Sequence, residues 1–306
     1  MLFNDDNFPQ NKINDSHNEI INKSAISLNT KTVDFFNEQR EATNNLDVSI
    51  KAVKIKKSFS QNQKNMAPNK KITILELEVV ISKNLKKGLK LRINKGNLKK
   101  SLRNVKDGIT YFGYEKNNND EKYSIDYLLE PRNKNNDDKY IGKYFQIRYD
   151  NNLYKYYIKD LGYGYGTFIK LVNEKKINNN LLINIGDSFI VFTFKKNNKE
   201  MITLQIFTGE QKCEIIEFNS TNSNFIVIGR DISNDVYIED KMISRKHCLI
   251  HNKNKGDNNY EWYIKDGNIE GKRSTNETWL YISEETEIYD QMIFKTNHNL
   301  FKCICK

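Results

Sequence analysis

The stretch NFIVIGRDISNDVYIEDKMISRKHCLIH (residues 224–251) holds two short apolar runs, FIVIG and CLIH, with turn-forming Gly, Asp, Asn and Ser residues between them. Short runs bounded in this way are typical of β-strands. Runs of the same kind follow at EWYIKD (261–266), TWLYI (278–282) and LFKCIC (300–305), and no segment carries a helical apolar stripe of two turns or more. The stretch therefore predicts an all-β fold built from many short strands.

The order of these segments occurs twice along the chain. Each copy alternates short strands with turn signals, a pattern typical of β-sandwiches. We therefore expect two tandem β-sandwiches, a first repeat at residues 70–197 and a second repeat at residues 201–306. The clearest matches are IGKYFQIRY (141–149) with ISRKHCLIH (243–251), YYIKD (156–160) with WYIKD (262–266), and YGYGTFI (163–169) with STNETWL (274–280).

With 306 residues the chain is long enough for two domains that each bury a core of their own. Residues 1–69 are polar and show no sustained apolar period, so they lack the hydrophobic surface needed to fold alone. We expect this stretch to be a largely disordered arm, with a short helix around residues 33–42 as its one regular element.

Nearly all of the net charge of +10 is concentrated in one region, because residues 70–107 carry twelve Lys and Arg against three Asp and Glu. A basic face there could meet nucleic acid, acidic lipid or an acidic protein such as a cytoskeletal surface. Aromatic residues are not interleaved with the cations as in RNA-binding proteins, which favours a solvated face without a recognition role.

Four cysteines without a CxxC pair fit reduced thiols in a reducing compartment. The start of the sequence lacks the features of a signal peptide, and no apolar run reaches about 18 residues. We therefore expect an intracellular protein without a membrane span. The compartment, whether cytoplasmic, cytoskeletal or nuclear, is left open.

Two pairs of candidate metal ligands, His247 with His251 and Cys303 with Cys305, lack the ligand spacing of zinc ribbons and fingers. The glycine stretch LGYGYG (161–166) precedes a β-like run instead of a helix and lacks the Lys-Ser/Thr of a P-loop. A tight turn with positive φ angles explains these glycines better. We expect no metal and no cofactor.

Ser244 and His247 are the candidates for a catalytic pair. Residues three positions apart in an extended strand point to opposite faces of the sheet, and no GxSxG elbow surrounds the serine. No pair of carboxylates, catalytic triad or cofactor loop is recognisable elsewhere. We therefore expect no catalytic residues and no enzymatic activity, and we expect His247 to be a buried histidine that pins its loop.

Three loops that each leave a strand end are candidates for an anion site. The pair GR ends the strand FIVIGR, SRKH follows in a later loop, and STNETW follows the strand WYIKD. Arg230 offers a planar fork of donors, Ser244 offers a hydroxyl, and Arg245 or Lys246 offers a second cation. Such charge-assisted hydrogen bonds contribute about 1.5–3 kcal/mol each, so the set suits a phosphate dianion.

This pattern resembles the forkhead-associated (FHA) domain family, whose motifs are Gly-Arg, then Ser-x-x-His, then Ser/Thr-x-Asn-Gly-Thr. The resemblance covers about residues 201–306, and the three separated motifs occur there in the order of the family. It implies a β-sandwich of about eleven strands that binds phosphothreonine peptides. The first repeat is similar to the same fold in a degenerate form.

By position, the resemblance implies roles for seven residues. Gly229 and His247 match the positions that shape the loops, and Asn276 matches the residue that fixes the backbone of the bound peptide. Glu277 departs from the family because it occupies the place of the glycine. An acidic residue there strains the turn if φ is positive and places a negative charge near a phosphopeptide. The residues implied to line the phosphate pocket are Arg230, Ser244, Arg245 and Thr275.

The first repeat lacks the fork and the hydroxyl of this site. The alignment places Tyr114 at the arginine, Gly142 at the serine, Phe145 at the histidine and Tyr165 at the asparagine, whereas Gly113 and Thr167 are retained. A frame without its anion-binding groups predicts a structural or protein-docking role for this repeat.

The resemblance implies a phosphothreonine-peptide-binding scaffold or adaptor that acts through the second repeat. The alternative is a structural component of a cytoskeletal or other large complex that uses both sandwiches without recognising phosphate. Thr32 and Thr43 each precede an apolar residue by three positions, the offset at which FHA domains discriminate, so each is a candidate self-ligand once phosphorylated. The sequence does not identify the partner, the kinase or the oligomeric state.

Overall fold

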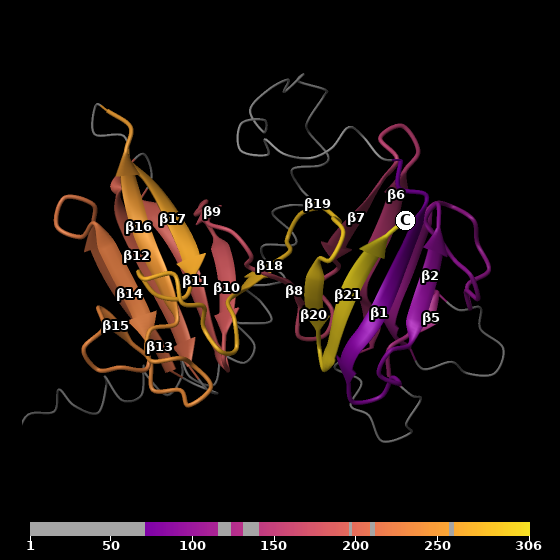
Figure 1. Cartoon of the computed structure of the whole chain (residues 1–306), viewed down its shortest axis with the longest axis horizontal. Coiled ribbons are helices and arrows are strands. Elements are labelled where there is room, and N and C mark those ends of the chain that lie inside the picture. The colour runs from indigo at the N-terminus through magenta and orange to yellow at the C-terminus, as the bar shows by residue number, and fades with distance from the viewer. Residues whose placement is uncertain (1–70, 116–123, 131–140, 196–197, 209–211, 257–259) are drawn as a thin grey trace, which may run out of the picture. The chain divides into compact units, whose positions relative to one another are not determined.

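The computed structural model describes residues 71–115, 124–130, 141–195, 198–208, 212–256 and 260–306 (Figure 1). Within these ranges the chain forms 21 strands joined by turns and loops. They contain no helix, and therefore none long and apolar enough to cross a membrane. The predicted all-β class is confirmed. The predicted arm, its short helix and the candidate self-ligands Thr32 and Thr43 lie outside the described residues.

The first eleven strands fall within the first repeat and the next ten within or just before the second. The first group is β1 (Ile74–Ser82), β2 (Lys90–Asn94), β3 (Asn97–Leu98), β4 (Ile109–Tyr114), β5 (Tyr127–Leu128), β6 (Gly142–Asp150), β7 (Lys155–Asp160), β8 (Thr167–Lys170), β9 (Lys175–Lys176), β10 (Leu181–Ile185) and β11 (Ser188–Lys195). The second group is β12 (Asn198–Thr208), β13 (Lys212–Asn219), β14 (Phe225–Gly229), β15 (Val236–Tyr237), β16 (Cys248–Asn254), β17 (Tyr260–Asp266), β18 (Trp279–Tyr281), β19 (Thr286–Glu287), β20 (Ile293–Thr296) and β21 (Asn299–Cys305).

These strands form one eleven-stranded sheet and two five-stranded sheets. The long sheet has the order β13-β12-β11-β10-β18-β8-β20-β21-β1-β2-β3. The short sheets have the orders β15-β14-β16-β17-β9 and β19-β7-β6-β4-β5. Buried side chains form two separate clusters, one for each short sheet and the part of the long sheet that it covers. The described chain therefore contains two β-sandwiches.

Alternation of buried and exposed side chains explains why these segments are strands. β7 buries Tyr156 and Ile158 while the residues between them are half-exposed, and β17 does the same with Trp262 and Ile264. Matching residues of the two repeats thus point into equivalent cores.

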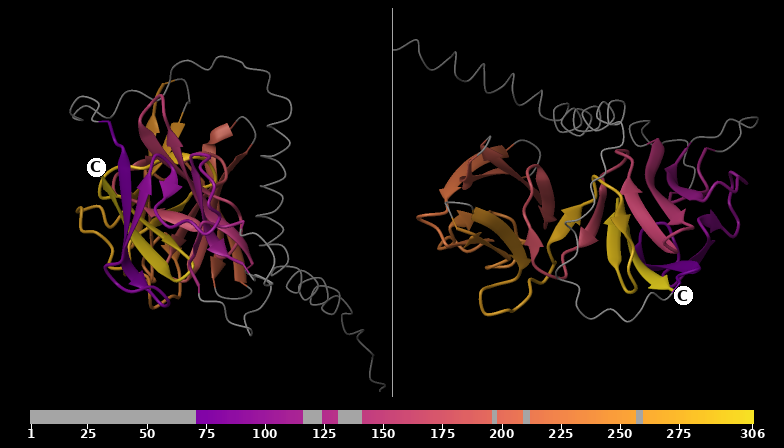
Figure 2. Two further views of the ribbon diagram at one scale, coloured as in Figure 1. Left: turned by 90° about the vertical axis from the view of Figure 1, so that its right-hand side faces the viewer. Right: turned by 90° about the horizontal axis from the view of Figure 1, so that it is seen from above.

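Several strand pairs cross the predicted limits of the repeats. In the long sheet β21 pairs with β1 and β11 pairs with β12, so the closing strands of each repeat join the opening strands of the other. The short sheets show the same exchange, since β9 pairs with β17 and β19 pairs with β7. The yellow β21 accordingly lies between the yellow β20 and the indigo β1 (Figure 1 and Figure 2). The limits 70–197 and 201–306 stay a prediction for the repeats, but they do not delimit the sandwiches.

We call residues 72–170 together with residues 282–306 the split sandwich, and residues 171–281 the continuous sandwich. Residues 171–195 are the first tail and residues 282–306 the second tail. The second tail brings Phe294 and Phe301 against Phe145, with ring centroids 5.3 and 6.5 Å from that of Phe145. Aromatic pairs of this kind add about 0.5–1.5 kcal/mol beyond the burial of their area. The first tail supplies apolar residues to the other core in the same way.

The two sandwiches share the long sheet through β8 and β18, which pair antiparallel with Ile169 opposite Leu280. β8 bonds β20 on its other edge, and β18 bonds β10. The two tails also meet here, because Lys295 Nζ donates to Asn184 Oδ1 at 2.5 Å and lies 4.7 Å from the centroid of the Trp279 ring. Strand pairing thus continues from one sandwich into the other.

Candidate anion-binding site

Three loops of the continuous sandwich are joined by hydrogen bonds. They lie between β14 and β15, between β15 and β16, and between β17 and β18. The backbone N–H of Arg230 donates to the Ser244 carbonyl at 3.1 Å, which links the first loop to the second. The backbone N–H of Thr275 donates to Ser244 Oγ at 3.0 Å, which links the third loop to the second. The structure thus brings together the three motifs that the sequence analysis singled out.

Gly229 ends β14 at the point where the second loop crosses it. A Cβ atom at this position would lie 2.2 Å from the Arg245 carbonyl oxygen and 2.8 Å from that of Ser244. Both contacts are with backbone, so no side chain fits unless the loop moves. The glycine before Arg230 therefore allows the first two loops to approach each other.

Arg230 is exposed, and its guanidinium makes no hydrogen bond or ion pair with any residue in the described ranges. Arg245 and Lys246 are also exposed. Hydrogen bonds from Ser233 hold the pKa of Asp231 below its ordinary value, and the charges of Arg245 and Lys246 lower this pKa further. Cations from two loops thus create a local positive potential beside the Ser244 hydroxyl.

The hydroxyl groups of Ser244 and Thr275 face each other, with 3.5 Å between their oxygen atoms. Ser244 Oγ already accepts the Thr275 N–H, and a hydroxyl that accepts in this way keeps its own proton to donate. Asn276 is exposed, and its Nδ2 donates to the Met242 carbonyl at 2.7 Å, which fixes this side chain between the second and third loops. Small polar groups of the second and third loops therefore lie close together.

His247 is fully buried and bonds two loops through its ring. Its Nδ1 accepts the Ser244 N–H at 3.1 Å, so Nε2 carries the proton and donates to the Glu277 carbonyl at 3.1 Å. Burial lowers the pKa of His247, which favours the neutral ring that this bonding requires. Both ring nitrogens are engaged with backbone, so the residue holds the loops together and is not placed as a base for the Ser244 hydroxyl.

Asp266 supports the third loop, and the sequence analysis did not single it out. Its buried carboxylate accepts the hydroxyls of Ser274 at 2.6 Å and Thr278 at 2.8 Å. Buried carboxylates are stable only when hydrogen-bonded, so this pair of hydroxyls fixes the loop on both sides of Thr275 and Asn276. The signal in the sequence is the Ile-Lys-Asp ending that both repeats share, at Asp160 and Asp266.

Glu277 adopts a left-handed conformation with φ of +64°, as expected for a residue in the place of a glycine. Backbone strain of this kind costs about 1–3 kcal/mol for a non-glycine residue. Its carboxylate forms an ion pair with Lys170, the last residue of β8. The negative charge that departs from the family pattern is thus balanced by a cation from the first repeat.

At the matching positions of the first repeat, Tyr114 at the end of β4 and Tyr144 in β6 are both buried. Phe145 pairs with Asp160 as Cys248 pairs with Asp266, so Tyr144 occupies the place of His247. The predicted match of Phe145 to the histidine is therefore wrong by one position. The retained Gly113 has the same role as Gly229, since a Cβ there would lie 2.1 Å from the Gly142 carbonyl oxygen.

The stretch LGYGYG forms a turn with positive φ at Gly162, Gly164 and Gly166, as predicted. Gly166, at +81°, occupies the position equivalent to Glu277. The first repeat thus has a glycine where the second has Glu277.

Several cations of the basic stretch face carboxylates of the same sandwich. Arg92 lies opposite Glu76 in the pairing of β1 and β2, and Lys90 lies opposite Glu78. Glu76 also accepts from Lys306 at 2.7 Å, and this hydrogen bond lowers its pKa. The positive charge counted from the sequence is therefore partly neutralised on the outer face of these strands.

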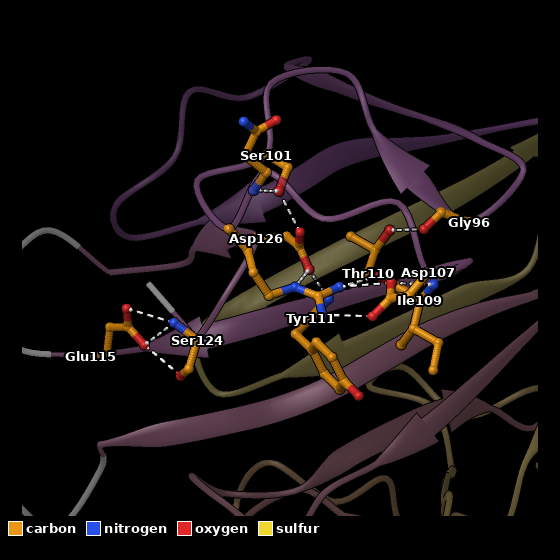
Figure 3. A network of polar contacts seen from close by, with 11 residues as sticks. Gly96, Ser101, Asp107, Ile109, Thr110, Tyr111, Glu115, Ser124 and Asp126 are labelled. Carbon is orange, nitrogen blue, oxygen red and sulfur yellow. Dashed lines mark hydrogen bonds and ion pairs between the residues drawn. The ribbon is translucent and has the colours of Figure 1, made fainter. Parts of the chain in front are cut away.

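Ser101, Asp107 and Asp126 belong to one polar network (Figure 3). Arg103 donates two hydrogen bonds to Asp107, at 2.7 and 2.9 Å, and one to Asp126 at 3.1 Å. Asp126 is buried and also accepts the Ser101 hydroxyl and the Tyr111 N–H. These internal contacts favour a structural role for Arg103 over recognition of nucleic acid or another acidic partner.

The part of the chain that the structure describes contains no group of three or more His, Cys, Asp or Glu side chains that could hold a metal ion. Cys248 and Cys303 are buried, and burial raises the pKa of both thiols. Thiols in such surroundings stay protonated and unreactive. These two cysteines therefore pack as small apolar residues.

Comparison with known proteins identifies a family for part of the chain. Residues 226–295 match the family model described as the FHA domain. Among solved structures, the crystal structure of the Slr1951 protein from Synechocystis sp. is similar at 21% sequence identity, over 30% of this chain and 89% of that chain, with a TM-score of 0.19. No match was found among the curated proteins.

Proposed function

We propose that the FHA domain identified at residues 226–295 makes this chain a phosphothreonine-peptide-binding scaffold or adaptor protein. FHA domains are phosphopeptide-binding interaction modules, which supports a role in recognising another protein over a role in catalysis. One observation carries the proposal. The free guanidinium of Arg230 and the facing hydroxyls of Ser244 and Thr275 come from three different loops that hydrogen bonds hold together.

A phosphate dianion matches the chemistry of this set. Arg230 would donate two parallel hydrogen bonds to phosphate oxygens, and the Ser244 and Thr275 hydroxyls would each donate one. Arg245 would add a second cation, and the Asn276 side chain would bond the backbone of the bound peptide. The neutral His247 and the buried Asp266 hold the loops in place, so little conformational entropy is lost when the ligand binds.

The rival proposal is a structural component of a larger complex that uses both sandwiches without recognising phosphate. The first repeat favours it, because it carries neither the arginine nor the serine of the site at the matching positions. Phosphatase treatment of a lysate before the chain is used as bait separates the two proposals. Partners that persist unchanged support the rival, and partners that are lost support phosphate recognition.

Calorimetry of the full chain with degenerate peptide libraries tests the proposed function. A library with a fixed phosphothreonine is expected to bind with micromolar affinity, which corresponds to about −8 kcal/mol. The same library with unmodified threonine is the matched control and is expected not to bind, because the charge-assisted hydrogen bonds are absent. Equal heats from the two libraries would contradict the proposal.

A further inference from the structure

Each tail pairs with the other repeat at equivalent positions. β9 of the first tail bonds β17 with Lys176 opposite Tyr263, and β19 of the second tail bonds β7 with Glu287 opposite Tyr157. Tyr157 and Tyr263 correspond, because each precedes the Ile-Lys-Asp ending of its strand. Lys176 and Glu287 thus occupy equivalent positions with opposite charges.

The ion-pair partners of Lys176 and Glu287 also occupy equivalent positions and also carry opposite charges. Lys176 pairs with Glu261, which lies two residues before Tyr263. Glu287 pairs with Lys155, which lies two residues before Tyr157, at 2.8 Å. A charge reversal in one tail is therefore matched by a charge reversal in the strand that receives it.

Closure of each tail on its own repeat would bring like charges together. Lys176 would lie beside Lys155, and Glu287 would lie beside Glu261. Closure within each repeat and the observed exchange would form equivalent strand pairs in the short sheets, because the two tails are equivalent segments. Differences between their side chains therefore decide which arrangement is more stable. Like charges at neighbouring cross-strand positions are destabilising, which disfavours closure within each repeat.

A second pair of equivalent residues does not discriminate between the two closures. Glu174 accepts from His251 at 2.6 Å, and Glu285 forms two hydrogen bonds with Arg148, both at 2.8 Å. Because both tails carry an acid here, these contacts would form in either arrangement. Of these contacts, the ion pairs Lys176–Glu261 and Lys155–Glu287 are therefore the ones that favour one arrangement over the other.

The first tail also anchors two loops of the candidate site. Asp240, in the loop between β15 and β16, accepts the Asp187 N–H at 2.8 Å and the Ser188 hydroxyl at 3.3 Å. Its other oxygen accepts the Met242 N–H at 2.7 Å, within the same loop. Arg273, in the loop between β17 and β18, donates to the Val172 carbonyl. Residues of the first repeat thus contact the loops that present Ser244 and Thr275.

We propose that the first repeat completes the binding site of the second. Its tail closes the continuous sandwich and positions the site loops through Asp240, and the reversed pairs Lys176–Glu261 and Lys155–Glu287 select this exchange over closure within each repeat. The part that concerns the site rests on the proposed function, whereas the part that concerns the exchange does not. The unit that binds the peptide is then the continuous sandwich, residues 171–281, and each sandwich contains strands from both repeats.

A cut between the repeats tests the exchange in the full chain. A specific protease site inserted between Lys196 and Asn197 allows cleavage after folding. The two fragments are expected to elute together in size-exclusion chromatography without denaturant, because each sandwich contains strands from both. Elution as two separate species would overturn the exchange. Affinity for the phosphothreonine library is expected to stay within about twofold of that of the uncut chain, since no site loop is cut.

Charge-reversed variants of the cleavable chain test the selection. Lys176→Glu combined with Glu287→Lys is expected to weaken fragment association by about tenfold, because like charges then meet in the exchanged arrangement. Adding Lys155→Glu and Glu261→Lys restores both pairs and is expected to restore the association. If the fragments of the double variant Lys176→Glu/Glu287→Lys associate as tightly as those of the parent chain, these charges do not select the exchange.

Asp240→Ala tests the positioning role. It is expected to weaken phosphothreonine-peptide binding by about fivefold while fragment association stays unchanged, because it releases the loop but not the tail. Asp240→Asn keeps an acceptor oxygen for the Asp187 amide and is expected to recover most of the affinity. Unchanged affinity in Asp240→Ala overturns the positioning role. If the fragments stay associated but neither the uncut nor the cleaved chain binds the phosphopeptide, the proposed function is overturned and the exchange is still supported.

Discussion

Replacement of Gly229 by alanine is expected to lower the free energy of unfolding by about 2–4 kcal/mol and to abolish phosphothreonine-peptide binding. The added methyl group would lie 2.2 Å from the Arg245 carbonyl oxygen, so β14 and the loop between β15 and β16 must separate. That movement breaks the hydrogen bonds from the Arg230 and Asp231 N–H groups to the Ser244 and Arg245 carbonyls. Chemical denaturation and calorimetry of the same preparation measure both effects.

Gly113→Ala is the matched control in the other sandwich, because its methyl group would lie 2.1 Å from the Gly142 carbonyl oxygen. It is expected to destabilise the protein to a similar extent and to leave the peptide affinity of the folded protein unchanged. A Gly229→Ala variant that is destabilised but binds as tightly as the parent chain would show that this loop does not form the site.

Replacement of Arg230 by alanine is expected to weaken phosphothreonine-peptide binding by about 2–3 kcal/mol, or one to two decades in affinity. The stability of the free protein is expected to change little, because the residue is exposed and its guanidinium makes no hydrogen bond or ion pair within the described ranges. Calorimetry gives the affinity, and thermal unfolding without peptide gives the stability.

Two further variants separate the contribution of the parallel hydrogen-bond donors of Arg230 to binding from the contribution of its charge. Arg230→Lys keeps the charge but loses the parallel donors, so its affinity is expected to lie between those of the parent chain and Arg230→Ala. Arg92→Ala removes an exposed arginine of the split sandwich and is expected to leave binding unchanged. Equal affinities for Arg230→Ala and the parent chain would exclude this arginine from the site.

The all-β class and the three motif loops could be predicted from the sequence because both signals are local. Alternation along β7 and β17 specifies which side chains are buried, and the motifs around Arg230, Ser244 and Thr275 are each only a few residues long. The role of Asp266 was missed because it depends on hydroxyls that the third loop brings back to it, at Ser274 and Thr278. A gap-free alignment also placed Phe145 one residue from its true equivalent.

The exchange of tails could not be predicted from strand patterns. Alternation specifies the face that a strand buries but not the strand that bonds its edge, and the two repeats have similar patterns. The information that distinguishes the arrangements lies in single side chains such as Lys176 and Glu287, whose partners belong to strands remote in sequence.

Backbone amide chemical shifts of the full chain, titrated with a short alanine-flanked phosphothreonine peptide, test the three-loop site most directly. The account predicts that the largest shift changes fall in the loops that contain Arg230, Ser244 and Thr275, and that the unphosphorylated peptide causes none of them. Changes that are equal for the two peptides, or that are largest in the loops around Tyr114 and Tyr165, would contradict it.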